Sequence, residues 1–283
     1  MNCKLTLSYD GASFHGWQVQ PTLPTIQGTL AAALHHITGE TILPQGSGRT
    51  DAGVHALAQV ASFALQSPIP APNLLRALNR ALPPSIRILT AEEVPETFHA
   101  RHSARGKTYQ YRIFHRQPDN IPDLICPPFL APYVWDCRWP LTLAPMQAAA
   151  ALLLGTHDFT SFAAADPDLT QRTETLSSRP EAAGRSGETC IPAATGPNPT
   201  KTITHSACTL EDDLLIYRIT GNGFLHHMVR NIVGTLAEIG RGALTPQDVP
   251  TILAARNRTA AGPTAPAAGL FLQSVHYDVS PNP

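Results

Sequence analysis

Segments typical of short β-strands alternate along this chain with segments whose apolar residues recur every three or four positions. We expect strands over residues 4–9, 57–63, 86–89, 107–115, 202–208, 214–220 and 271–278. We expect helices over residues 25–39, 72–82, 145–154 and 225–239, with one more beginning near Thr245. This order predicts an α+β fold, in which helices cover a sheet.

The chain is longer than a usual single domain. It has 283 residues, so we expect two domains or two similar α+β halves, formed by residues 1–105 and 106–283. One short internal similarity agrees with this division: Ile26-Gln-Gly-Thr-Leu-Ala resembles Ile232-Val-Gly-Thr-Leu-Ala, although six positions can match by chance. Residues 177–200 are rich in Pro and Gly and lack periodicity, which predicts a flexible insertion.

The composition excludes several classes of protein. The net charge is −1 and only 14% of residues are charged, so a uniformly cationic surface is excluded. The longest apolar run, residues 148–154, is too short to cross a bilayer, and the N-terminal residues lack the apolar stretch of a secretory signal. We therefore expect a soluble cytoplasmic protein without a membrane partner.

Metal and disulfide sites are not predicted either. The five cysteines are scattered and never form a C-x-x-C pair, and the twelve histidines include no H-E-x-x-H spacing. Two adjacent pairs stand out, His35-His36 and His226-His227. Because neighbouring side chains on a helix point about 100° apart, we expect each pair to make poor joint metal ligands.

The densest candidate motif is Gly46-Ser-Gly-Arg-Thr-Asp-Ala-Gly-Val-His55. Its glycines allow unusual backbone angles and close approach of a substrate. Arg49 and Asp51 are two positions apart, so in an extended segment they share a face, and an arginine keeps a nearby carboxylate ionised. Such a group suits nucleophilic or general-base chemistry. The alternative is a glycine turn in which Asp51 only ties down its own loop.

A second motif is basic and aromatic. Residues 98–116 contain five Lys or Arg and no acid, with Tyr109 and Tyr111 between them. Such a segment can neutralise phosphates while a tyrosine stacks on a base, which favours a nucleic acid as partner. The alternative is a solvated face of an edge strand with both tyrosines in the core.

Two further segments carry candidate residues. Arg230 lies in a mostly apolar helical pattern, and an arginine directed inward there needs an acidic partner, for which Asp51 is the candidate. Arg230 can equally lie on the solvent-exposed side of the helix or form a purely structural pair. Residues 9–18 form a polar and aromatic loop after a strand, a position that often binds ligands.

Taken together, these stretches resemble the tRNA pseudouridine synthase A family almost from end to end. Gly48-Arg-Thr-Asp-Ala-Gly-Val-His55 is similar to the active-site signature of that family. Further similar motifs occur in the right order: Tyr9-Asp-Gly with Phe14-His-Gly-Trp-Gln18, Phe98-His-Ala-Arg101, Gly155-Thr-His-Asp-Phe-Thr-Ser-Phe162 and His227-Met-Val-Arg-Asn231. One departure is the apparent insertion at residues 177–200, which leaves these motifs intact.

The resemblance implies a pseudouridine synthase fold with two α+β halves around a central cleft, a homodimer and no cofactor. It implies isomerisation of uridine to pseudouridine at positions 38, 39 and 40 in the anticodon stem-loop of tRNA. Asp51 matches the catalytic aspartate, and Tyr109 matches the tyrosine that stacks on the target base. Arg49, Arg230 and Leu270 match residues around the pocket. We also expect tRNA contacts from Arg101, Arg105, Lys107, Phe14 and Trp17.

Two other functions compete with this interpretation. A catalytically silent RNA-binding protein would keep the basic segment but would not need Asp51 with two arginines. A glycosidase-like hydrolase would use two carboxyl groups that flank the bond, and no second acid lies near Asp51 in the sequence.

Overall fold

A computed structural model describes residues 1–115, 125–164 and 198–278. Its strands form one sheet with the order β4-β1-β3-β10-β5-β9-β8-β7, to which β2 is added at β3 and β6 at β5. The strands are β1 (Asn2–Tyr9), β2 (Gln45–Gly46), β3 (His55–Ala64), β4 (Ile86–Val94), β5 (Ala104–Phe114), β6 (Trp135–Asp136), β7 (Gly155–Asp158), β8 (Thr200–Glu211), β9 (Leu214–Gly221) and β10 (Leu270–Tyr277).

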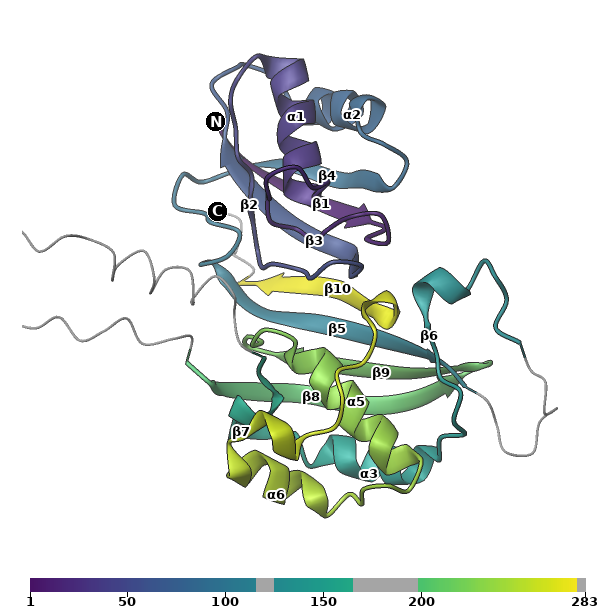
Figure 1. Ribbon diagram of the computed structural model, residues 1–283. Helices are drawn as coiled ribbons and strands as arrows, with labels where there is room; N and C mark the ends of the chain where they lie inside the picture. Colours follow the sequence, from purple (N-terminus) through teal and green to yellow (C-terminus); the bar gives the residue numbers. More distant parts are fainter. Residues whose placement is uncertain (116–124, 165–197, 279–283) are drawn as a thin grey trace, which may run out of the picture.

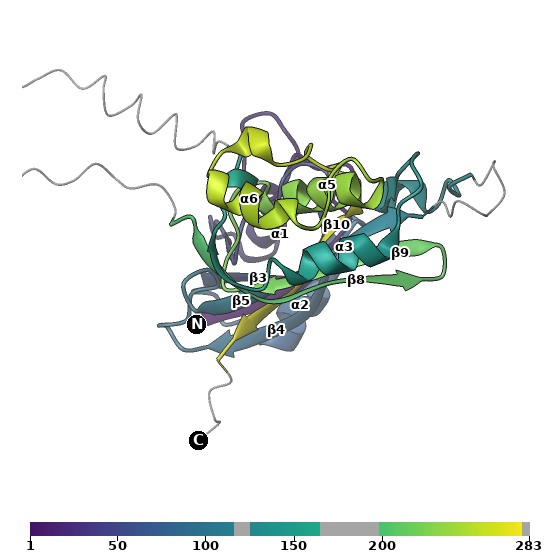
Figure 2. The ribbon, with the colours of Figure 1, turned by 90° about the horizontal axis from the view of Figure 1, so that it is seen from below.

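The helices form two groups, one at each end of this sheet (Figure 1). They are α1 (Ile26–Thr38) and α2 (Ala71–Ala81) in the N-terminal part, and α3 (Leu143–Ala151), α5 (Met228–Gly240) and α6 (Asp248–Ala255) in the C-terminal part. Figure 2 shows α3, α5 and α6 on one face of β8 and β9. The prediction of an α+β fold with two similar halves is confirmed.

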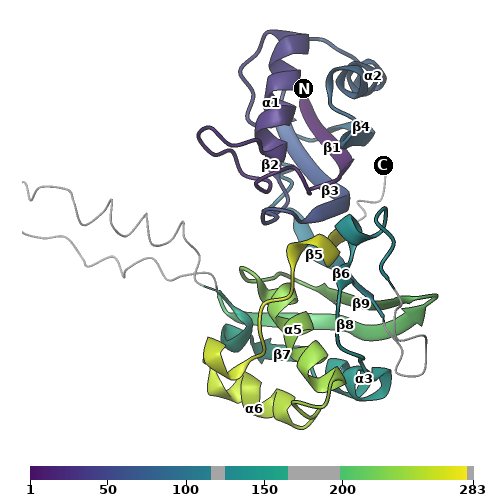
Figure 3. The ribbon, with the colours of Figure 1, turned by 45° about the vertical axis from the view of Figure 1, so that its right-hand side comes forward.

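Strand β10 joins the two halves (Figure 1), and Figure 3 shows α1 and α2 in one half and α3, α5 and α6 in the other. It pairs with β3 in parallel through Phe271 and His55, and with β5 in antiparallel orientation from Leu270 to Tyr277. The C-terminal strand therefore lies between the N-terminal strands and the rest of the sheet. Through this pairing, the loop that leads into β3 lies beside the C-terminal half.

Local sequence signals account for most helix ends. Thr25 caps α1 by accepting a hydrogen bond from the Gly28 backbone, and Gly39 ends it in the left-handed conformation, both as predicted. Helix α5 differs, because it begins at Met228 rather than Leu225. The cause is His227, whose φ of 58° lies in the left-handed region. Residues 225–227 therefore cannot continue the right-handed helix, which begins at the next residue.

Two predictions about chain organisation are not decided here. The boundary at residue 105 falls inside β5 and stays a prediction. Of the predicted insertion at 177–200, residues 177–197 lie outside the described part of the chain, and Thr200 is the first residue of β8. Within the described residues, no helix combines the length and the apolar character that crossing a bilayer requires.

Candidate active site

Asp51 lies in the loop between β2 and β3, which a neighbouring loop holds in place. The Trp17 backbone donates a hydrogen bond to Thr50 O at 3.0 Å, and the Gly53 backbone donates one to Phe14 O at 3.2 Å. Gly53 has a φ of +76°, a backbone conformation that residues other than glycine rarely adopt. The chain thus reverses direction directly after Asp51, and the two residues of the neighbouring loop brace that reversal.

A second set of contacts fixes the start of the same loop. Gln59 of β3 accepts a hydrogen bond from Ser47 Oγ at 2.6 Å and donates one to Gly48 O at 2.9 Å. Lys107 of β5 donates from Nζ to Ser47 O at 2.8 Å. A Cβ atom at Gly48 would lie 2.4 Å from this Nζ, so the glycine makes room for the ammonium group. Burial lowers the pKa of Lys107 to about 8.

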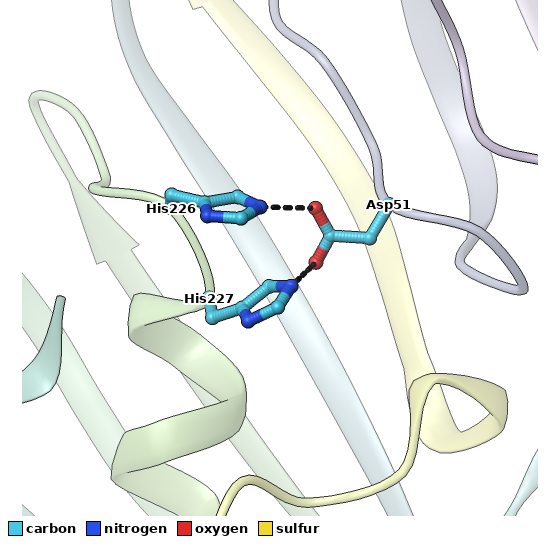
Figure 4. A group of neighbouring side chains, drawn as sticks. All are labelled: Asp51, His226 and His227. Atoms are coloured by element: carbon cyan, nitrogen blue, oxygen red, sulfur yellow. Dashed lines mark ion pairs between the residues drawn. The ribbon is translucent and has the colours of Figure 1, made fainter. Parts of the chain in front are cut away.

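The C-terminal half presents three basic side chains to the Asp51 carboxylate. His226 Nε2 lies 3.5 Å from Oδ1, and His227 Nε2 lies 3.2 Å from Oδ2 (Figure 4). Nη1 of Arg230, a residue of α5, lies 3.4 Å from the same Oδ2. The Asp51 side chain is 24% exposed, so the carboxylate is close to these groups and still open to solvent. Sequence-distant residues therefore form one site.

The two imidazoles face the same carboxylate because they precede the helix. Their rings are stacked, with centroids 3.9 Å apart. The left-handed φ of His227 turns the chain just before α5, so the 100° divergence of helical neighbours does not apply. The expectation that this pair points apart is wrong. The site residues predicted from the sequence do not include this pair, although His227 stands in one of the motifs similar to the family.

Electrostatics in the site depend on partial burial and on the arginine. Burial lowers the pKa of His227, the Asp51 charge opposes that shift, and Arg230 adds to it. Arg230 is held by a second contact, since its Nε donates to Ala265 O at 2.7 Å. The guanidinium thus keeps its position beside the carboxylate, as the predicted pairing of Asp51 with Arg230 requires.

Tyr109 of β5 lies beside this group. Its ring contacts Phe224 edge-on, with centroids 5.0 Å apart, and only 8% of the residue is exposed. Burial raises the pKa of the Tyr109 hydroxyl, and the negative charge of Asp51 contributes in the same direction. The phenol therefore stays protonated at neutral pH. No hydrogen bond joins its hydroxyl to the described residues.

The other predicted site residues take different positions. Arg49 is exposed and donates from Nε to Gln18 Oε1 at 3.2 Å. Among the described residues, Arg230 is the arginine that forms an ion pair with Asp51. Leu270 is buried at the start of β10, opposite Tyr111 of β5. Arg101 and Arg105 are exposed, and Arg105 pairs with Asp278 at 2.7 Å.

Three of the expected tRNA contacts do not agree with the positions of their side chains. Trp17 and Phe14 belong to the hydrophobic core, at 2% and 8% exposure, and a Cβ atom at Gly46 would lie 2.5 Å from the Trp17 ring. Lys107 points into the Asp51 loop rather than to solvent. Trp17 and Lys107 hold the Asp51 loop through the backbone contacts described above, and the Phe14 backbone accepts a hydrogen bond from Gly53, so we assign these residues to the support of that loop. Arg116 lies outside the described residues.

Comparison with known proteins identifies the family. The family model described as tRNA pseudouridine synthase matches residues 6–103 and 149–278. A tRNA pseudouridine synthase A from Solibacter usitatus is 47% identical over 274 residues, which cover 97% of this chain and 98% of that protein. The enzyme of that name from Moorella thermoacetica is 44% identical over 276 residues, with 97% and 98% covered. The chain therefore belongs to the tRNA pseudouridine synthase family.

Proposed function

We propose that this protein isomerises uridine to pseudouridine in the anticodon stem-loop of tRNAs, at positions 38, 39 and 40. The observation that carries the proposal is the partly exposed Asp51 carboxylate, held between the two halves against Arg230 and close enough to Tyr109 to raise the pKa of its hydroxyl. Family membership supports the reaction, and the resemblance of the motifs supports the positions. The protein acts as a homodimer in the cytoplasm and needs no cofactor.

The reaction needs the kinds of groups that this site contains. The bond between C1′ and N1 breaks, the uracil rotates, and C1′ joins C5, while N1 gains a proton and C5 loses one. No electrons are exchanged, so a carboxylate and a proton carrier suffice. Asp51 is the group that acts on the nucleoside, and Arg230 keeps its carboxylate charged and oriented.

The target nucleotide must leave its stack before it reaches Asp51, at a cost of a few kcal/mol. We assign to Tyr109, which lies beside Phe224 and is 8% exposed, the role of stacking on the displaced uracil, which offsets part of this cost. Arg101 and Arg105 are exposed and bind phosphates that lie away from the reacting base. Binding and chemistry are thus assigned to different residues.

The competing functions fit the site less well. Each ion-pair partner that Asp51 has among the described residues is a base, whereas a hydrolase of the glycosidase type needs a second carboxyl group about 5–10 Å away. A silent RNA-binding protein would gain nothing from a carboxylate that faces its nucleic acid, since that charge repels phosphates.

Tritium release from tRNA that carries [5-³H]uridine tests the proposal. An active synthase releases tritium and keeps the base attached, whereas a hydrolase frees the base and a binding protein does neither. Transcripts in which C replaces U at 38, 39 or 40 then test the positions. Full tritium release from a transcript without uridine at all three would contradict the assigned positions.

A further inference from the structure

Beyond the isomerase reaction, we propose that Asp51, His226 and His227 form a binding site for a divalent transition-metal ion such as Zn²⁺. Each residue offers one ligand atom, and these atoms all lie within 4.8 Å of one another (Figure 4). The ion would occupy the carboxylate that the reaction uses and would therefore inhibit the enzyme reversibly. This consequence, unlike the binding itself, rests on the proposed catalytic role of Asp51.

The spacing of these ligand atoms can be compared with the spacing of ligands around a bound zinc ion. Zinc binds nitrogen and oxygen at about 2.0–2.2 Å in tetrahedral geometry, which places neighbouring ligand atoms about 3.3–3.5 Å apart. His226 Nε2 lies 3.5 Å from Asp51 Oδ1, and His227 Nε2 lies 3.2 Å from Asp51 Oδ2. These separations are close to those expected between the ligand atoms of one ion.

The ligands are already held in this arrangement by the backbone. His226 O accepts a hydrogen bond from the Ala164 backbone at 3.0 Å, and His227 O accepts one from the Asn231 backbone at 2.9 Å. The Asp51 loop is braced separately by Trp17 and Lys107. Little conformational entropy is therefore lost when an ion binds.

The donor set defines the class of ion. Two imidazoles and one carboxylate suit zinc and the later first-row metals, whereas magnesium and calcium prefer all-oxygen sites. Arg230 lies 3.4 Å from Asp51 Oδ2 and opposes a second positive charge. We therefore expect reversible binding rather than a permanent structural metal.

Cobalt(II) absorption measures this binding without reference to catalysis. The purified full-length protein is stripped with EDTA, dialysed and titrated with CoCl₂, and the visible bands of bound cobalt are recorded. We expect one cobalt per chain, displaced by one equivalent of zinc. His226→Gln, His227→Gln and Asp51→Asn should each weaken binding by about tenfold or more, because one of three protein ligands is lost. Each variant is tested alone, with its melting temperature recorded, so that a poorly folded one leaves the other two informative.

The other adjacent pair provides a matched control. His35 and His36 are exposed on α1, where helical neighbours diverge, so the double change of both to Gln removes two imidazoles and should leave cobalt binding unchanged. The proposal is overturned if the wild type shows no cobalt bands, or if well-folded variants at His226, His227 and Asp51 bind as the wild type does.

Zinc inhibition of tritium release then tests the consequence. Micromolar zinc should slow the wild type, EDTA should restore it, and His227→Gln should require about tenfold more zinc for the same fractional inhibition. Cobalt binding at this site without any inhibition would contradict the catalytic role of Asp51 while leaving the metal site standing. Failure of both would overturn the metal site itself.

Discussion

The Asp51 site and the basic segment at residues 98–115 both depend on cationic side chains, but these differ in burial. Arg230 in the site is 16% exposed and lies against a carboxylate from the other half. Arg105 in the segment is 68% exposed, as is its partner Asp278. Salt screens a partly buried charge only weakly, so this charge acts on groups in contact with it. Salt screens an exposed charge strongly, and such a charge acts mainly on a partner that approaches from solution. We therefore expect the site to govern kcat and the exposed arginines to govern tRNA affinity.

The largest effect is expected for Asp51→Asn. The amide keeps the size of the side chain but removes its charge, so we expect kcat to fall by about 10³-fold or more, equivalent to about 4 kcal/mol of barrier. The tRNA affinity and the melting temperature should change little. Asp278→Asn is the matched control, since it removes an exposed carboxylate and should leave kcat intact. Tritium release under saturating tRNA measures both. Turnover by Asp51→Asn within tenfold of wild type would refute its assignment.

The next effect is expected at Tyr109. If its hydroxyl takes part in proton transfer, Tyr109→Phe should slow turnover by about 10²-fold and leave stability unchanged, because no described residue accepts a hydrogen bond from it. Tyr111→Phe is the control: its hydroxyl donates to Pro266 O at 2.7 Å, so its loss should cost about 1 kcal/mol of unfolding free energy and little activity. Single-turnover rates and urea unfolding separate the two. A fully active Tyr109→Phe would make Tyr109 a packing residue only.

A smaller effect is expected for Lys107→Met. Methionine fills much of the same space but cannot donate to Ser47 O, so the Asp51 loop should loosen and kcat should fall by about tenfold. The dependence of tRNA affinity on salt should stay the same, because the ammonium group faces the loop. A reduced salt dependence with normal kcat would instead place Lys107 on a phosphate, as the sequence analysis expected.

Charge reversal of the exposed arginines should show the opposite behaviour. Arg101→Glu and Arg105→Glu should weaken tRNA affinity severalfold at low salt and reduce the slope of log K against log salt by about one each. Saturating kcat should be unchanged. Fluorescence anisotropy over a range of salt concentrations measures the slope. A salt-independent affinity of the wild type would refute phosphate binding by this segment.

The smallest expected effect concerns alkaline stability. The pKa of Lys107 is lowered from 10.5 to about 8 in the folded protein. Between these values the unfolded chain holds a proton that the folded chain has lost, so this group makes stability rise with pH over that window. Stability relative to Lys107→Met should therefore increase from pH 8 upward. Arg105→Met should show no such trend, since both states keep arginine charged. Urea unfolding at pH 7.5 and pH 9.5 measures the difference.

Much of the fold was predictable because its signals are local. Strand β1 follows from the alternation of Leu5, Leu7 and Tyr9 with polar residues, and both ends of α1 follow from Thr25 and Gly39. The short strands β2, β6 and β7 were not predicted. Two of them have only two residues, and such segments carry no periodicity that could reveal them.

The candidate site was predictable only in part. Asp51 and Arg230 stand in motifs that resemble a family, and the structure brings them together. The positions of Trp17 and Lys107 were not predictable, because aromatic and basic residues near a motif look alike whether they face solvent or the core. Lys107 turns inward because Gly48 has no side chain and leaves space for the ammonium group. The resulting contact joins strand β5 to the loop that follows β2, which no local sequence signal reveals.

The sequence by itself determined the α+β class, most helices and strands, the family and the identity of the central carboxylate. All of these depend on neighbouring residues or on motifs read in order. The tertiary structure alone decided what surrounds Asp51. The pairing of β10 between β3 and β5 brings the halves together, and the left-handed turn at His227 directs two imidazoles to one carboxylate. Such contacts join residues far apart in the chain, and a backbone angle at one residue leaves no periodic trace in the sequence.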